Sequence, residues 1–248
     1  MFNPFSLEGK VILITGASSG IGKEIAIECS KMGSQLIVTA RNSERLNDTF
    51  NLLQGGTHQQ FIADLATDSG IDSLAGVLPS LDGIVHVAGI VKPKPFPFLN
   101  RSELDEIMNI NFYGPTLLTN VLIRKKLIKK QASIVFISSI SGVTCSSSGG
   151  SAYSASKGAI NGIIKGMALD LAAKQIRVNS ILPGMIDTGI YNGSAISEQD
   201  LIEDRKRYPL GRYGKPTDVA YAAIYLLSGA SSWVTGSNLL IDGGYTLL

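Results

Sequence analysis

A tyrosine and a lysine four residues apart, Tyr153 and Lys157, are the residues of this sequence best suited to proton transfer. A spacing of four residues puts two side chains on the same face of a helix. An ammonium beside a phenol favours the phenolate, so we expect Lys157 to lower the pKa of Tyr153 from about 10 towards neutrality. A phenol tuned in this way can donate a proton to a developing alkoxide, or accept one in the reverse reaction.

Three serines follow an apolar segment that ends at Ile137, and each could hydrogen-bond a substrate oxygen: Ser138, Ser139 and Ser141. Side chains alternate along a strand, which separates Ser138 from the other two but leaves Ser139 and Ser141 on the same side. We expect Ser139 to make the substrate contact, with Ser141 as the alternative that alternation leaves open.

A glycine-rich segment, Thr15-Gly-Ala-Ser-Ser-Gly-Ile-Gly22, joins an apolar run to an amphipathic one. Glycines permit a positive φ, a close approach of backbone to phosphate and tight packing of helix on strand. Free N–H groups and the dipole at a helix start favour a pyrophosphate, although a tight turn without a ligand is the alternative reading. The nucleotide contacts expected here are Gly16, Ser18, Ser19, Gly20, Ile21 and Gly22.

Short apolar runs alternate with longer amphipathic stretches, which is typical of a parallel sheet covered by helices. We expect an α/β fold in one domain over residues 1–248, with an insertion at about 188–216 that selects the substrate. The expected strands are 11–15, 36–39, one ending at 62, 84–87, 134–137, 177–182 and 238–241. The expected helices are 21–32, 44–53, 102–130 with a break near Gly114-Pro115, and 153–173, and the three prolines in 91–97 indicate a loop.

Polar or glycine-containing segments follow several of these strands and should meet at the carboxyl edge of the sheet, where ligands bind in such folds. They include Asp64-Leu65 and the Ala88-Gly89 turn. The second strand ends at Thr39-Ala40-Arg41, without the carboxylate that would repel a 2′-phosphate. A guanidinium suits bidentate phosphate binding, so we expect NADP(H) rather than NAD(H). The alternative is that Arg41 is only a solvated surface charge.

The motifs Thr15-Gly-x3-Gly-x-Gly22, Ser139, Tyr153-x3-Lys157 and Pro183-Gly184, in this order, resemble the short-chain dehydrogenase/reductase family from about Leu7 to Leu248. The resemblance implies a Rossmann-type, doubly wound sheet of seven parallel strands with helices on both faces. It implies that Ser139 orients a carbonyl, that Tyr153 is the acid/base and that Lys157 also binds the nicotinamide ribose. It further assigns a proton-relay water to Asn111 rather than to Asn109, since Gly114 follows three positions later. The cofactor contacts that it implies elsewhere are Asp64 at the adenine, Thr188 at the carboxamide or phosphates, and Pro183, Gly184 and Ile186.

The sequence departs from the family pattern in two places. His86-Val87-Ala88-Gly89 stands where the family usually has Asn-Asn-Ala-Gly, and one residue is inserted among 142–151. We interpret His86 as a packed or hydrogen-bonded side chain, because Tyr153 and Lys157 already supply the proton chemistry.

Within the family, the pattern is nearest to the 3-oxoacyl-[acyl-carrier-protein] reductases of fatty acid biosynthesis and to general ketone reductases, especially in residues 208–212 and 240–244. Lys130 and Lys174 fall where such reductases present basic residues to an acidic carrier, although cations at helix ends are favoured anyway. A steroid, sugar or small-alcohol dehydrogenase is the second hypothesis. A nucleotide-binding regulator without turnover is the third, and it would not need Ser139, Tyr153, Lys157 and Asn111 together.

Composition excludes several other classes. The formal net charge is +2, which gives no overall attraction to nucleic acid or an anionic membrane. The two cysteines, Cys29 and Cys145, have no metal-ligand spacing, so we expect no metal, and their sparse use fits a reducing cytoplasm. The opening residues Met1–Pro4 do not resemble a secretion signal. We expect a homotetramer or homodimer, as the family commonly pairs through the helices expected at 102–130 and 153–173 and the last strand.

Overall fold

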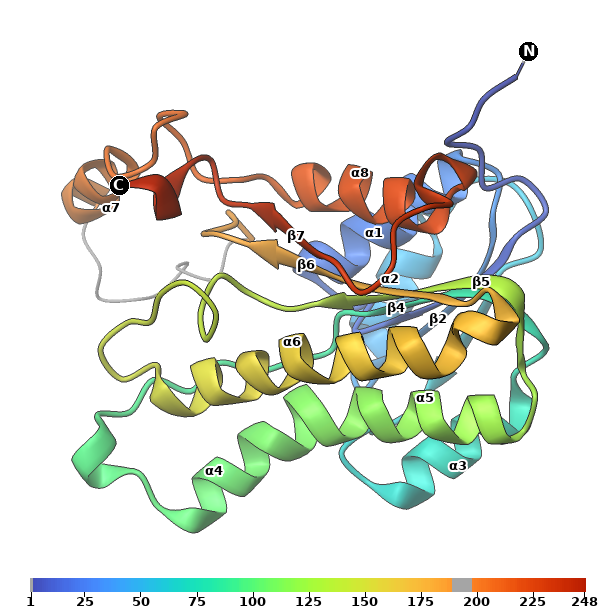
Figure 1. Cartoon of the computed structure of the whole chain (residues 1–248), viewed down its shortest axis with the longest axis horizontal. Helices are drawn as coiled ribbons and strands as arrows, with labels where there is room; N and C mark the ends of the chain where they lie inside the picture. Colours follow the sequence, from blue (N-terminus) through green and yellow to red (C-terminus); the bar gives the residue numbers. More distant parts are fainter. Residues whose placement is uncertain (1, 189–197) are drawn as a thin grey trace.

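The computed structural model describes residues 2–188 and 198–248, whose strands form one parallel sheet in the order β3-β2-β1-β4-β5-β6-β7 (Figure 1). The order reverses between β1 and β4, which makes their carboxyl ends the switch point of a doubly wound, Rossmann-type fold. This confirms the fold class expected from the sequence. The strands are β1 (Val11–Thr15), β2 (Gln35–Ala40), β3 (Gln59–Ile62), β4 (Leu81–His86), β5 (Ile128–Ile137), β6 (Arg177–Pro183) and β7 (Asn238–Ile241).

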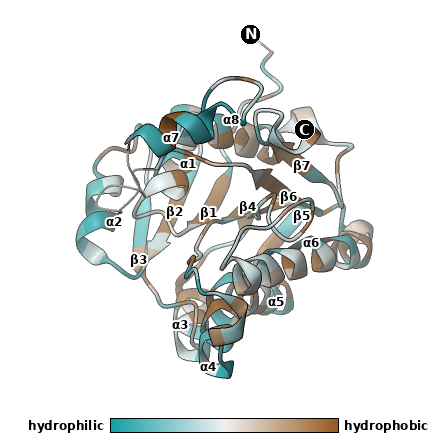
Figure 2. Ribbon diagram, turned by 90° about the vertical axis from the view of Figure 1, so that its left-hand side faces the viewer, coloured by the Kyte–Doolittle hydropathy of each residue, from teal (hydrophilic) through white to brown (hydrophobic). Residues whose placement is uncertain are grey.

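Helices cover both faces of this sheet (Figures 1 and 2). One layer packs α1 and α8 against each other, with α2 beside β2 and β3; the other contains α3, α5 and α6. The α-helices are α1 (Gly20–Lys31), α2 (Ser43–Phe50), α3 (Asp68–Val77), α4 (Arg101–Met108), α5 (Gly114–Arg124), α6 (Ser151–Leu171), α7 (Glu198–Arg205) and α8 (Pro216–Leu227). Short 3₁₀ turns occur at Phe96–Phe98, Ala172–Lys174, Gly229–Ser231 and Tyr245–Leu247, and Asn109–Tyr113 is one turn of π-helix.

The central strands are buried on both faces, as a sheet covered twice requires. In β1, Ile12 and Ile14 join the core beneath α1 and α8, whereas Leu13 lies between them in sequence and joins the core beneath α3, α5 and α6. All three are fully buried. The two cores fix the register of β1, since a shift by one residue would exchange its faces.

The prediction of a helix over residues 102–130 was wrong at its C-terminal end. α5 ends at Arg124, the backbone reverses at Lys126 with a φ of 59°, and Ile128 already pairs with Leu81 of β4. Ile128 is buried in the second core, so packing of a β-branched residue decided in favour of a strand. The expected break near Gly114-Pro115 is instead the π-turn, after which Pro115 stands in the first turn of α5, where its missing N–H costs nothing.

In the described ranges, 2–188 and 198–248, no helix is both long and apolar enough to cross a membrane. The insertion expected at 188–216 lies partly outside these residues, at 189–197. Its described remainder contains α7 and the short bridge between Ile186 and Gly214.

Candidate active site

A cavity of about 870 Å³ opens at the carboxyl edge of β1, β2, β3 and β4. Its walls come from the loops that follow these strands and from the start of α1, as expected for the switch point of the sheet. Twelve of the residues expected to touch a nucleotide line it: Gly16, Ser18, Ser19, Gly20, Ile21, Gly22, Arg41, Asp64, Leu65, Ala88, Gly89 and Thr188. Eight lining residues were not anticipated: Thr39, Ala40, Asn42, Arg45, Ala63, Ala66, Val87 and Ile110.

Two glycines at the base of the cavity allow neighbouring backbones to approach closely. Gly16 has a φ of 68°, and a Cβ on it would lie 2.6 Å from the amide nitrogen of Ala88. A Cβ on Gly22 would collide with the carbonyl oxygen of Gly16. The Thr15 hydroxyl accepts the N–H groups of Val87 and Ala88, at 3.2 and 3.4 Å, and so ties the turn after β4 to β1. The residues therefore form a cradle of bare backbone that fits a pyrophosphate.

The start of α1 is left available to a ligand. Its N-cap, Ser19, makes no side-chain capping bond, and its first turn carries no acidic residue. By contrast, Asn42, Thr67 and Asn100 cap α2, α3 and α4 through their side chains. Uncapped N–H groups and the helix dipole favour an anion at this end of the cavity.

Two guanidinium groups stand at the end of the cavity near β2. Arg41 follows the strand and Arg45 lies on α2 four residues later, and both line the cavity and are exposed. Within the described ranges, neither side chain has a hydrogen bond or an ion pair to a protein group. Arg45 was missed in the sequence, because Arg41 precedes α2 and a spacing of four residues therefore does not predict that the two side chains meet. No carboxylate follows Ala40, so this end of the cavity suits a phosphate monoester.

Tyr153 is in the first turn of α6, and Ser139 follows the end of β5. Their side chains lie beside each other. Removal from water raises the pKa of the Tyr153 phenol above its ordinary value, and an interaction with the Ser139 hydroxyl opposes this rise less strongly. The lower pKa expected from Lys157 was therefore wrong. A phenol with a raised pKa keeps its proton at neutral pH, which suits a proton donor.

The Lys157 side chain explains this difference. Its Nζ donates to the carbonyl oxygen of Ile137 at 2.8 Å and lies 5.7 Å from the centroid of the Tyr153 ring. Burial lowers the Lys157 pKa to about 8. The amine thus faces the ring and the end of β5. It also lies beside Gly89, which lines the cavity, because a Cβ on Gly89 would lie 3.7 Å from Nζ.

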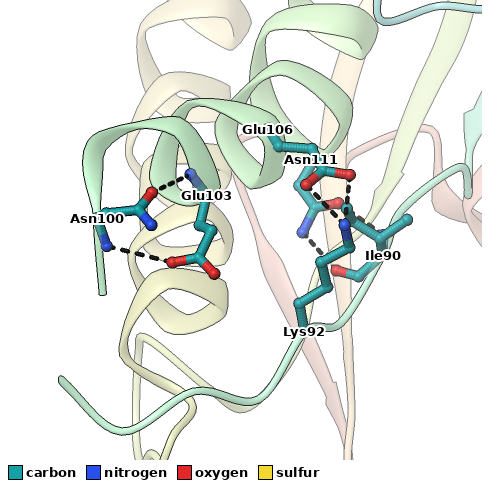
Figure 3. Close-up of polar contacts among 6 residues, drawn as sticks. All are labelled: Ile90, Lys92, Asn100, Glu103, Glu106 and Asn111. Carbon is teal, nitrogen blue, oxygen red and sulfur yellow. Dashed lines mark hydrogen bonds and ion pairs between the residues drawn. The ribbon is translucent and has the colours of Figure 1, made fainter. Parts of the chain in front are cut away.

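Asn111 is buried in the π-turn, whereas Asn109 is exposed. The Asn111 side chain accepts from the N–H of Ile90 at 2.8 Å and donates to the Ile90 carbonyl at 3.0 Å (Figure 3). It also donates to the Ser156 hydroxyl at 3.0 Å. π-turns are frequent at functional sites because they redirect one side chain inside a helix. The π-turn at Asn109–Tyr113 places the Asn111 side chain beside Gly89 and Ser156. Ser156 is the residue immediately before Lys157.

The proline-containing loop after Ile90 is fastened to α4. Lys92 pairs with Glu106 and Lys94 with Glu103, while Asn100 and Glu103 form a capping box (Figure 3). The N–H of Lys94 also donates to the carbonyl of Gly149 at 2.9 Å, just before α6 begins. The loop therefore borders the Tyr153 side of the site. Individually, these exposed ion pairs contribute at most about 1 kcal/mol each.

Alternation correctly separated the serines after β5. The Ser138 hydroxyl faces α6, where it contacts the Lys157 carbonyl and Asn161, whereas Ser139 Oγ accepts from the Ser141 N–H at 3.1 Å. The other five predicted cofactor contacts do not line the cavity: Tyr153, Lys157, Pro183, Gly184 and Ile186. Pro183 and Gly184 hold the end of β6 against Ile140 and Ile241, and Ile186 is buried against Gly214.

His86 is a packed residue. It is 3% exposed, its Nε2 lies 2.8 Å from the Thr119 hydroxyl, and its ring stacks on Phe136 at 4.7 Å between centroids. Burial lowers its pKa to about 3, so the ring is neutral at physiological pH. Its Nδ1 has no hydrogen-bond partner among the residues that the structure describes.

The cysteines and acidic residues offer no metal centre among residues 2–188 and 198–248. Cys29 is fully buried on the inner face of α1, and burial raises the pKa of its thiol. Cys145 is half-buried in the loop before α6.

Comparison with known proteins agrees with this geometry. Residues 16–246 match the family described as Enoyl-(Acyl carrier protein) reductase. The 3-oxoacyl-[acyl-carrier-protein] reductase FabG of Rickettsia prowazekii is 33% identical over 242 residues, covering 98% of this chain and 99% of that protein. The Pseudomonas aeruginosa RhlG/NADP active-site complex has a TM-score of 0.91 at 29% identity, covering 99% of this chain and 100% of that one. A 7α-hydroxysteroid dehydrogenase complexed with NADH and 7-oxo glycochenodeoxycholic acid has a TM-score of 0.87 at 31% identity, covering 98% of each chain. The chain therefore belongs to the short-chain dehydrogenase/reductase family of oxidoreductases.

Proposed function

We propose that this protein is an NADP(H)-dependent reductase of ketones, with 3-oxoacyl thioesters as its preferred substrate class. The observation that carries the proposal is the arrangement of groups along the carboxyl edge of the sheet. Arg41 and Arg45, unpaired within the described ranges, stand at one end of the cavity, and the glycine cradle lies in its middle. At the other end, Gly89 lies beside the Nζ of Lys157, which in turn faces the Tyr153 ring.

The cofactor, when bound, supplies the hydride, and the chain's own residues handle binding and the proton. Ser139 and Tyr153 hydrogen-bond the substrate oxygen and hold the carbonyl in the orientation for attack. Tyr153 gives its phenolic proton to that oxygen as negative charge develops on it. Lys157 holds the nicotinamide ribose, and Asn111 holds a water through which the proton is replaced.

NADP(H) is favoured over NAD(H) by the two guanidinium groups and by the absence of a carboxylate after Ala40. Relatives of this fold include both a complex with NADP and one with NADH, so the fold itself does not decide the cofactor. The substrate class is supported by the similarity to 3-oxoacyl-[acyl-carrier-protein] reductases over nearly the whole chain. We assign substrate selection to the segment 188–216.

The test is NADPH oxidation against a panel that contains an acetoacetyl thioester, a 7-oxo steroid and a sugar ketone. We expect the thioester to have the highest kcat/KM. A higher kcat/KM for the steroid or the sugar would contradict the proposed substrate class but not the proposed reduction of a ketone by NADPH. Tyr153→Phe should retain NADPH binding and lose turnover by about 10³-fold or more; a protein that binds NADPH but reduces nothing in any form would be a nucleotide-binding regulator.

We propose separately that an acidic acyl carrier docks at Lys130 and Lys174, which are both exposed. Lys130 stands near the start of β5, about 30 Å along the extended chain from Ser139, and α6 separates Lys174 from Tyr153 by about 30 Å. Docking there would serve a long acyl arm or the site of a neighbouring copy. The double variant Lys130→Glu/Lys174→Glu should raise KM for the carrier-bound substrate and leave KM for its small thioester unchanged. If KM for the carrier-bound substrate is the same in the wild type and the variant, an acyl carrier does not dock at these lysines.

We also propose self-association, as a dimer or tetramer. Large apolar side chains are exposed near the C-terminal end of the chain, with Trp233 at 99% and Leu248 at 89% exposure, and Leu240 of β7 is also exposed. Surfaces of this kind are commonly covered by another chain. Light scattering coupled to size exclusion would give the mass, and a monomer of 26.3 kDa at micromolar concentration would reject the assembly.

A further inference from the structure

Asn161, one helical turn after Lys157, lies at the centre of a buried hydrogen-bond network. Its Nδ2 donates to the Lys157 carbonyl and to Ser138 Oγ, both at 2.9 Å. Its Oδ1 accepts from the Ser180 hydroxyl of β6 at 3.0 Å. Asn161 is 6% exposed, Ser138 3% and Ser180 is fully buried. Both amide hydrogens and the amide oxygen of Asn161 are therefore used, which fixes the orientation of its side chain.

The same network holds Lys157 at two points. Its Nζ donates to the carbonyl of Ile137, and its own carbonyl accepts from the Ser138 hydroxyl at 3.2 Å. Ile137 and Ser138 are the two residues immediately before Ser139. Four hydrogen bonds thus join Lys157 to Ile137 and Ser138, directly or through Asn161, which makes two of them.

The network extends to the edge of the sheet. Ser180 Oγ also lies 2.8 Å from the side chain of Asn238 on β7. Because a hydroxyl has one hydrogen and Ser180 donates it to Asn161, the Asn238 amide must turn its NH₂ towards Ser180. The network therefore connects α6 with β6, β7 and the end of β5, and its polar groups are hydrogen-bonded to one another. A buried network whose polar groups are all hydrogen-bonded makes the surrounding structure rigid.

We infer that Asn161 is a positioning residue for the proposed reaction: through Ser138 and the Lys157 carbonyl it fixes the spacing between Ser139 and the Tyr153–Lys157 pair. This inference rests on the proposed function. A substrate carbonyl must be held by Ser139 and Tyr153 at once, although they belong to different elements. A misplacement of about 1 Å between such groups can lower a rate by 10²-fold. An apolar residue at 161 would pack but would leave the Lys157 carbonyl and Ser138 free to shift.

The test compares Asn161→Leu with a matched control, Asn179→Leu. Asn179 is also a fully buried asparagine; it binds the Val234 carbonyl and the Ser237 N–H and has no bond to α6. Both variants should unfold at lower temperature. Only Asn161→Leu should lower kcat, by at least tenfold, with KM for the ketone and the Kd of NADPH from fluorescence titration changed less than threefold.

A double-mutant cycle adds a second readout. If Asn161 acts through Ser138, the kcat loss in Ser138→Ala with Asn161→Leu should be much smaller than the product of the two single losses, and Ser138→Thr, which keeps the hydroxyl, should recover most of the rate. Multiplicative losses, or equal loss of kcat in Asn161→Leu and Asn179→Leu, would overturn the inference.

If the wild type itself reduces no ketone while binding NADPH, the proposed function fails first. Hydrogen exchange at residues 137–141 then decides the inference alone: the exchange should rise in Asn161→Leu and stay unchanged in Asn179→Leu.

Discussion

The Nζ of Lys157 faces the Tyr153 ring at 5.7 Å and donates its hydrogen bond to the backbone of Ile137, not to the phenol oxygen. The four-residue spacing alone would assign to Lys157 both the positioning of neighbouring groups and the lowering of the Tyr153 pKa, whereas the structure assigns it only the first. Lys157 holds the end of β5 and lies beside Gly89, while Ser139 is the group that counteracts the raised pKa of Tyr153. The consequences concern both the direction of the reaction and its dependence on pH.

Alcohol oxidation should rise with pH over a range that Ser139 sets. The base in this direction is the Tyr153 phenolate, whose pKa is raised by burial and lowered by Ser139. We expect kcat/KM for NADP⁺ reduction to increase with pH up to at least about 10, and Ser139→Ala to move this limb to higher pH as well as lowering the rate. Ketone reduction, which uses the protonated phenol, should lack the rise. Profiles of both directions between pH 6 and pH 11 would test this, and an oxidation limb unmoved in Ser139→Ala would contradict it.

Charge reversal at the β2 end of the cavity should change the cofactor preference. Arg41→Asp should raise KM for NADPH by 10- to 100-fold and leave KM for NADH unchanged or lower, because a carboxylate repels a 2′-phosphate and accepts a 2′-hydroxyl. Arg45→Ala should act in the same direction by a smaller factor. Arg124→Asp, an exposed arginine at the end of α5, is the control for net charge. A constant ratio of the two KM values in Arg41→Asp and Arg45→Ala would mean that neither guanidinium touches the phosphate.

The cradle beneath the cavity should tolerate no side chain. In Gly16→Ala, the new Cβ would stand 2.6 Å from the Ala88 nitrogen at a φ of 68°, so the loop must move. We expect the Kd of NADPH to rise at least tenfold and the free energy of unfolding to fall by about 1–3 kcal/mol. Gly76→Ala is the control, because the exposed Gly76 of α3 has nothing within 4 Å of a Cβ, and it should stabilise by about 0.5–1 kcal/mol. Equal NADPH affinities in the two variants would refute the cradle.

The sequence predicted the sheet and the glycine loop well because both depend on local patterns. The run Val11–Thr15 followed by Gly16 can hardly be anything but a buried strand and a tight turn. The start of β5 at Ile128 could not be read, because a basic stretch on a helix end and one on a strand have the same composition, and only pairing with Leu81 separates them. The pKa of Tyr153 could not be read either, since it depends on how far the phenol is removed from water and on where the amine of Lys157 points. α3 was missed because its two glycines and two aspartates obscure the helical period. α8 was missed because residues 219–227 are apolar or aromatic at every position and so show no alternation with a polar face.

His86 should make the fold sensitive to acid. Its folded-state pKa is about 3, against an ordinary value of 6.5, so between these limits the unfolded chain binds the proton and the folded one does not. The free energy of unfolding should therefore fall as pH drops from 6.5 towards 3, by up to about 1.4 kcal/mol per pH unit. His86→Asn places the family's usual residue at this position, and its urea midpoint should fall less steeply over that range. His58→Asn, which replaces the chain's only other histidine, controls for the loss of one titrating group. If both variants follow the wild-type slope, the burial of a neutral His86 does not govern acid stability.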